Sequence, residues 1–123
     1  MTTSPDPRSI ESVNIVPLRK IVERQQVWGR MAAEHGVDNP VPPWKSSLDG
    51  MCDALDQSAC GADILAFTRR RSEEDQLAAT VYADLPYPES QLVSLAHSLV
   101  VAGVIDEKEL QERLASVRAR LEA

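Results

Sequence analysis

The chain has 123 residues, which is enough for one domain and too few for two. Hydrophobic residues make up 43% of it and charged residues 26%, a balance typical of globular rather than disordered proteins. Thirteen Lys and Arg residues against nineteen Asp and Glu residues leave a formal charge of -6, which argues against a general nucleic-acid binder. With two Trp, two Tyr and one Phe, a base-stacking surface is not expected either.

Three further classes are disfavoured. The longest nearly apolar run, residues 92–105, is too short to cross a bilayer, so no membrane partner is expected. Residues 1–8 are polar and hold two prolines, unlike a secretory signal. Two cysteines do not make a disulfide framework. These features predict a soluble, reduced, cytoplasmic protein.

In chain order, residues 1–14 are predicted to be a flexible arm and residues 15–123 a helical domain. Pro17 suits the first position of a helix, and Gly36 is a suitable stop. Between them, apolar side chains recur at helical spacing. They are Leu18, Ile21, Val22, Val27, Trp28 and Met31. A proline-stiffened connector over residues 37–43 follows.

Three helix starts are predicted in the middle of the chain. Ser46, with Asp49 three residues later, resembles a helix start. The apolar face behind it comprises Leu48, Met51, Cys52 and Leu55. A second helix is predicted from about Asp63 through Arg71, with Ile64, Leu65 and Phe67 as its apolar face. Residues 72–75, Ser-Glu-Glu-Asp, can then start a new helix, because acidic residues favour a first turn.

The last third of the chain predicts a turn and two helices. Residues 85–88, Leu-Pro-Tyr-Pro, disfavour helix continuation. The next helix is predicted to bury Leu92, Leu95, Ala96, Leu99 and Val100 and to close at Gly103. Residues 106–109 open the final helix, whose apolar stripe is Leu110, Leu114, Val117 and Leu121. Since no stretch alternates like a strand, the predicted fold is all-α with four to six helices.

Few residues stand out as candidates for chemistry. The run Arg69-Arg70-Arg71 is either a solvated helix end or a fork for an anion, since arginine presents fixed paired donors. Tyr82 and Tyr87 are either packing residues near a turn or positioned hydroxyls.

A metal site within this chain is not expected. His35 sits beside a helix stop, and His97 lies in an apolar helix where a core role is more common. Cys52 and Cys60 do not form a Cys-x-x-Cys pair. No Ser/His/Asp arrangement is apparent from the spacing, so the residues by themselves do not predict a self-contained enzyme.

The order of motifs from residue 69 onward resembles a known family. Three arginines, the Thr-Val-Tyr step at 80–82, the Leu-Pro-Tyr step at 85–87, a helix to Gly103 and an acidic helix start at 106–110 follow one another. This order is similar to the helical part of the β subunit of the nitrile hydratase and thiocyanate hydrolase family. The likeness is to its three-chain members, such as toyocamycin nitrile hydratase.

The resemblance implies a role within a complex. In that family a separate α subunit binds cobalt(III), alternatively iron(III), through cysteines, two of which are oxidised. The β subunit supplies an arginine to the oxidised sulfur oxygens and a tyrosine to the pocket. The matching positions here are Arg71 and Tyr87, and Phe67, Arg70 and Gln91 are candidate pocket residues. Pro88 and Gln91 stand where many members carry aromatic residues, which would widen or reshape the pocket.

The implied partners are the metal-binding α subunit, a small-molecule nitrile and a separate chain carrying the SH3-like β-barrel, for which 123 residues leave no room. The expected function is that of a non-metal-binding β-type subunit, inactive by itself, of a nitrile hydratase that converts nitrile and water to amide. Three alternatives stay open: a thiocyanate hydrolase β subunit, an accessory protein that delivers metal to the α subunit, and an unrelated helical interaction module.

Overall fold

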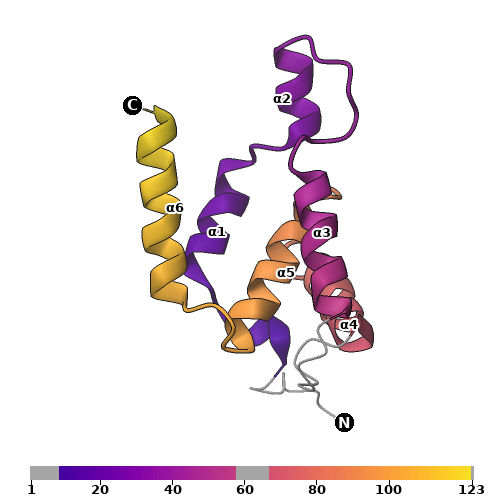
Figure 1. Ribbon diagram of the computed structural model, residues 1–123, viewed down its shortest axis with the longest axis vertical. Helices are drawn as coiled ribbons and strands as arrows, with labels where there is room; N and C mark the ends of the chain where they lie inside the picture. The colour runs from indigo at the N-terminus through magenta and orange to yellow at the C-terminus, as the bar shows by residue number, and fades with distance from the viewer. Residues whose placement is uncertain (1–8, 58–66, 123) are drawn as a thin grey trace.

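The computed structural model describes residues 9–57 and 67–122. Over these ranges the chain is helical and contains no strand, which confirms the predicted all-α class (Figure 1). In the part of the chain that the structure describes, a short 3-10 turn, η1 (Ile10–Ser12), precedes six α-helices. These are α1 (Val16–Arg24), α2 (Trp28–Glu34), α3 (Lys45–Asp56), α4 (Phe67–Ala79), α5 (Glu89–Val101) and α6 (Glu107–Glu122). No helix of the described ranges is long and apolar enough to span a bilayer.

Helix α5 lies at the centre and separates two hydrophobic clusters. Its Val93 joins the first, and its Leu95 and Leu99 join the second. The first cluster consists of Ile10, Ile15, Leu18, Leu77, Tyr82, Leu85 and Val93, and Leu48 completes the second. In Figure 1, α3 and α6 stand on opposite flanks of the molecule with α1 and α5 between them. Within the predicted arm, Ile10 is only 7% exposed and belongs to the core, whereas residues 12–14 are exposed.

The first helical stretch is interrupted, contrary to the apolar pattern. Gln25 has a φ of 49°, in the left-handed region, and its N–H donates to the carbonyl of Val22 at 3.2 Å. This conformation ends α1 and lets α2 start at Trp28 in a new direction. The amide of Trp28 donates to Glu89 Oε1 at 2.9 Å, which ties the start of α2 to α5. Gly36 has a φ of 68° and follows the end of α2, as predicted.

Helix α3 starts earlier than its predicted cap. Trp44 is the residue before the helix, and no side chain caps it, so the predicted start at Ser46 is wrong. The amide of Lys45 donates instead to the carbonyl of Pro42 at 3.0 Å. The connector prolines fix a turn that leads directly into the helix, so a capping serine is not needed. Of the predicted apolar face, Leu48 is 1% exposed, whereas Met51 is 44% exposed.

Helix α4 runs through the predicted break at residues 71–72. The arginines lie in its first half, so the predicted helix end at Arg71 is wrong, while residues 63–66 lie outside the described ranges. The acidic residues that suggested a new start form i,i+4 ion pairs within one helix. Arg69 Nε lies 3.2 Å from Glu73 Oε2, and Arg71 Nε lies 3.8 Å from Asp75 Oδ1.

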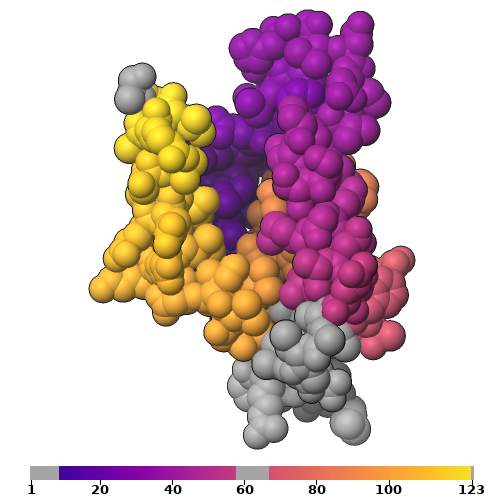
Figure 2. Space-filling view, in the orientation of Figure 1, coloured from indigo at the N-terminus to yellow at the C-terminus, as the bar shows by residue number. Residues whose placement is uncertain are grey.

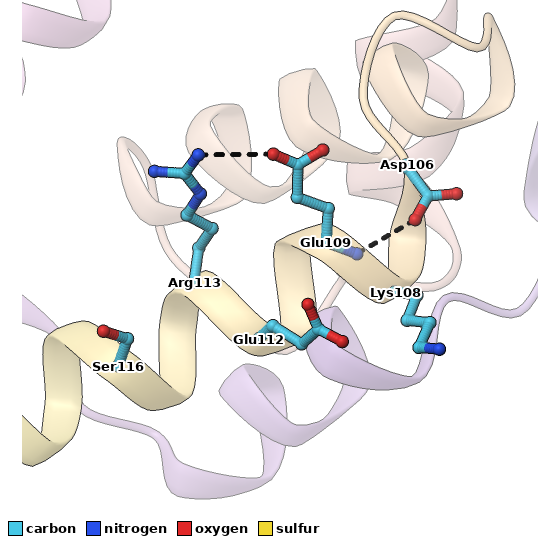
Figure 3. A pocket seen from close by; sticks show the side chains of 6 residues that line it. All are labelled: Asp106, Lys108, Glu109, Glu112, Arg113 and Ser116. Carbon is cyan, nitrogen blue, oxygen red and sulfur yellow. Dashed lines mark hydrogen bonds and ion pairs between the residues drawn. The ribbon is translucent and has the colours of Figure 1, made fainter.

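The junction between α5 and α6 matches its prediction. Gly103 has a φ of 78°, and the amide of Val104 donates back to the carbonyl of Leu99 at 2.9 Å, a pattern typical of a glycine helix stop. Asp106 Oδ2 then accepts from the amide of Glu109 at 3.0 Å and caps α6 (Figure 3).

Candidate functional site

Three of the family-derived site residues, Arg70, Tyr87 and Gln91, lie on a surface formed by α3, α4 and the start of α5. We call it the α3–α4–α5 surface and define it by eight residues. They are Lys45, Asp49, Cys52 and Asp56 of α3, Arg70 and Glu74 of α4, Tyr87 of the turn and Gln91 of α5. The α3 members are spaced three or four positions apart, so they follow one face of that helix.

Arg70 points inward and joins α4 to α3. It is 7% exposed, and its Nη2 lies 2.5 Å from Asp56 Oδ1. Its guanidinium carbon lies 5.8 Å from the ring centroid of Phe67, within the range of a cation–π contact. Phe67 itself is 55% exposed. The two predicted pocket residues of α4 are therefore in contact, and Arg70 already has an anionic partner within the chain.

Arg71 points outward. Its side chain is 66% exposed, and its ion-pair partner among the described residues is Asp75 of the same helix, at 3.8 Å. Such a long, exposed pair holds a guanidinium weakly, because solvent screens the charges and fixing two long side chains costs conformational entropy. Arg69 is also exposed, at 52% of its side chain, and pairs with Glu73. Successive helical positions differ by about 100°, which explains why neighbouring arginines face different surroundings.

Tyr87 and Gln91 are brought together by Lys45. The Lys45 ammonium lies 5.3 Å from the ring centroid of Tyr87 and 3.3 Å from Gln91 Oε1. The same Nζ lies 2.5 Å from Asp49 Oδ1. Hydrogen bonds to Asp49 and then to Tyr87 raise the pKa of Lys45, so the ammonium stays charged beside the phenol. Tyr87 is nevertheless 66% exposed, so its ring is open to a partner.

Glu74 lies on α4, one turn after Arg70, and is partly buried. Burial, followed by the charge of Asp75, raises the pKa of this carboxyl. The charges of Arg71, Arg70 and Lys45 act in the opposite direction, so all three cations lie within electrostatic reach of Glu74. Tyr87 contacts Lys45 on the α3–α4–α5 surface, whereas Arg71 lies outside it, on the exposed side of α4.

The donors of the described ranges do not suit a metal ion. No group of three His, Cys, Asp or Glu side chains in residues 9–57 and 67–122 is placed to hold one. Burial raises the pKa of the Cys52 thiol, against the lowering effect of Arg70, which disfavours the thiolate that metals bind. Cys60 lies outside the described residues. No metal-dependent step can therefore be assigned to side chains of this surface.

Tyr82 and His97 belong to the core. Both are 0% exposed, and the Tyr82 hydroxyl lies 2.7 Å from His97 Nδ1. His97 Nε2 lies 2.8 Å from the carbonyl oxygen of Ile10. The core role expected for His97 is confirmed, and the alternative of a positioned catalytic hydroxyl at Tyr82 is disfavoured by its complete burial. His35 is exposed at the end of α2.

The sequence analysis missed Lys45, Asp56 and Glu74. The i,i+4 spacing of Lys45 and Asp49 was a detectable sign of a helical ion pair. Asp56 and Glu74 gave no such sign, because their partners lie on other helices or across the falsely predicted break in α4.

Comparison with known proteins gives one match. The family model described as nitrile hydratase beta subunit, N-terminal, matches residues 25–123, a range that contains Arg70, Arg71, Tyr87 and Gln91. Searches of curated proteins and of solved structures found no match. A family model that covers most of the chain establishes membership. The chain therefore belongs to the nitrile hydratase β-subunit N-terminal family.

Proposed function

We propose that the chain is the helical β-type subunit of a nitrile hydratase complex, in which Arg71 and Tyr87 complete the active site of a metal-binding α subunit. Family membership indicates a nitrile hydratase subunit with an α subunit as its partner. In this proposal the α subunit holds cobalt(III), or alternatively iron(III), and a separate chain carries the β-barrel. The product is the amide formed from a nitrile and water.

The weak internal pairing of Arg71 is the observation that best supports the proposal. Oxidised cysteine ligands carry negatively charged sulfur oxygens, which need fixed, charge-assisted donors when a partner chain buries them. Arg70 forms a 2.5 Å ion pair with Asp56, whereas Arg71 is exposed and lies 3.8 Å from Asp75. Arg71 therefore loses fewer contacts than Arg70 would if it left its internal partner to bind an anion of another subunit.

Tyr87 fits a role at the border of the pocket. The neighbouring Lys45 and Gln91 hold a polar, positively charged environment around its ring. Pro88 is buried directly after it, so the backbone at this point is anchored while the Tyr87 side chain remains exposed. An anchored backbone with an exposed phenol suits a residue that meets substrate at a subunit boundary.

The test is an Arg71→Lys substitution in the complex co-expressed with its α subunit and barrel chain. Lysine keeps the charge but loses the bidentate fork, so we expect assembly to persist and amide formation to fall by about 100-fold or more. Arg69→Lys is the matched control, because Arg69 is also exposed and paired with an acidic residue four positions on. It should retain activity within about twofold.

The readouts are amide formation from an organic nitrile, subunit content by size-exclusion chromatography, and cysteine oxidation state by mass spectrometry. Undiminished hydration by the Arg71→Lys complex, with its cysteines correctly oxidised, would contradict the proposal. Assaying the same complex with thiocyanate distinguishes the nitrile hydratase from a thiocyanate hydrolase. A chain absent from the purified active complex would instead identify a metal-delivery protein.

A further inference from the structure

A second surface lies between α1 and α6, away from the α3–α4–α5 surface. The two helices form an open groove of about 560 Å³. Its apolar lining includes Ile21 of α1 and Leu114, Val117 and Leu121 of α6. Figure 2 shows the corresponding hollow between α6 and the rest of the molecule, with α1 visible at its back.

The apolar stripe of α6 becomes more exposed along the helix. Leu110 is half-buried against the first hydrophobic cluster, whereas Leu114 is 38%, Val117 41% and Leu121 77% exposed. The base of α6 is held by Glu107, whose Oε1 accepts from the amide of Val16 at 3.1 Å. Helix α6 is thus attached at its start, and its second half presents an apolar stripe that the described residues do not cover.

The opposite face of α6 is polar and internally paired. Arg113 Nη2 lies 3.4 Å from Glu109 Oε1, and Lys108, Glu112 and Ser116 share this face (Figure 3). It is the normal solvated side of an amphipathic helix. The apolar side therefore faces the groove. A role as the solvated side of the helix explains the polar face but does not explain why the apolar side is exposed.

The α1 side of the groove is basic. Helix α1 carries Arg19, Lys20 and Arg24 against the single acidic residue Glu23, although the whole chain has a charge of -6. Lys20 and Arg24 line the groove and form no ion pair with any carboxylate in residues 9–57 or 67–122. Across the groove, Arg118 is already paired with Glu122 at 2.8 Å. The unbalanced charge at the rim is therefore positive.

We infer that the α1–α6 groove binds an amphipathic helix of another polypeptide, with its apolar face on Ile21, Leu114, Val117 and Leu121 and acidic side chains against Lys20 and Arg24. Apolar residues at i, i+3 and i+7 suit helix-in-groove recognition, and the basic rim selects the charge of the bound helix. A second copy of this chain is disfavoured as the occupant, because its own α6 carries balanced charges rather than an acidic edge.

This site is separate from the proposed catalytic role. The family match begins at residue 25, so α1, which supplies one wall and the basic rim, precedes the matched range. The docking residues include none of those assigned to catalysis, so the docking proposal can fail while the role of Arg71 stands, and the reverse also holds.

The experiment uses the full chain and two fluorescent helical peptides of about 18 residues. Both carry leucines at i, i+3, i+4 and i+7, and their flanking positions are all Glu in one and all Lys in the other. By fluorescence anisotropy we expect the acidic peptide to bind about tenfold more tightly than the basic one. Lys20→Glu with Arg24→Glu should reverse this preference. Leu114→Gln with Val117→Gln should weaken binding of the acidic peptide about tenfold or more.

Lys108→Glu is the control, since it reverses one charge on the polar face of the same helix and should leave binding unchanged. Circular dichroism verifies that each variant keeps its helix content. Equal affinity for both peptides, or no saturable binding of the acidic one, would overturn the proposal. It would also be overturned by light scattering that shows a dimer dissociated by Leu114→Gln, because the occupant would then be a second copy.

Discussion

At the scale of single residues, the buried His97 shows how the core fixes a protonation state. The carbonyl oxygen of Ile10 can only accept a hydrogen bond, so His97 Nε2 carries the proton. Nδ1 is then the acceptor for the Tyr82 hydroxyl. Both ring nitrogens of a neutral imidazole are satisfied, and η1 is joined to α5 through the same side chain.

This arrangement predicts a pH dependence of stability. Burial lowers the pKa of His97, against smaller raising effects of the Ile10 carbonyl and Glu73. Below about pH 6.5 the unfolded chain binds a proton that the folded chain resists, so stability falls as pH decreases. Urea unfolding should give a lower free energy of unfolding at pH 5 than at pH 7. His97→Gln should flatten this difference, and an unchanged difference in the variant would refute the role of His97.

The rotation of α4 about its axis decides which of the three arginines points inward, and the sequence could predict this only in part. Family resemblance selected Arg71 from its interval to the Leu-Pro-Tyr step, and this assignment stays a prediction. Which arginine points inward depends on the rotation of α4 against α3, and therefore on the contact between Arg70 and Asp56. That contact joins residues 14 positions apart on different helices, so no local sequence pattern predicts it.

At the scale of helices, boundaries set by local chemistry were predictable and those set by context were not. Gly103 and Asp106 mark the junction of α5 and α6 by their own backbone preference and capping ability. Gln25 ends α1 although neither its type nor its neighbours signal a stop. The break allows Glu89 to meet the amide of Trp28, a contact between residues 61 positions apart.

Two glycines provide a matched test of these boundaries. A Cβ added at either Gly29 or Gly103 meets no atom within 4 Å, so space does not distinguish them. Gly103 has a φ of 78°, whereas Gly29 lies within α2. We expect Gly103→Ala to lower the free energy of unfolding by about 1 kcal/mol, and Gly29→Ala to raise it by roughly 0.5–1 kcal/mol.

Urea denaturation of both variants at one pH measures the difference. Equal shifts of the same sign would contradict the assignment of Gly103 to a left-handed helix stop. Because neither side chain contacts the α3–α4–α5 surface, the pair also separates backbone effects from any effect on the proposed site.

At the scale of the whole molecule, the two surfaces involve helices on different flanks, α3 and α4 on one and α6 on the other (Figure 1). The α3–α4–α5 surface carries Tyr87, one of the two residues that the family resemblance assigns to catalysis, and Arg71 lies on the exposed side of α4. Helix α6, which forms one wall of the α1–α6 groove, lies on the other flank (Figure 1). The all-α class and the amphipathic pattern of α6 could be read from the sequence. The sequence could not show that the apolar stripe of α6 remains exposed. An amphipathic pattern is the same whether the residues that bury it belong to the same chain or to another chain.

The structure of the assembled complex, determined by crystallography or electron cryo-microscopy, tests the central claim most directly. We predict that the Arg71 guanidinium lies about 3 Å from the sulfur oxygens of the oxidised cysteine ligands in the α subunit, having left Asp75. A map of the complete complex in which the Arg71 side chain faces bulk solvent, still beside Asp75, would contradict it.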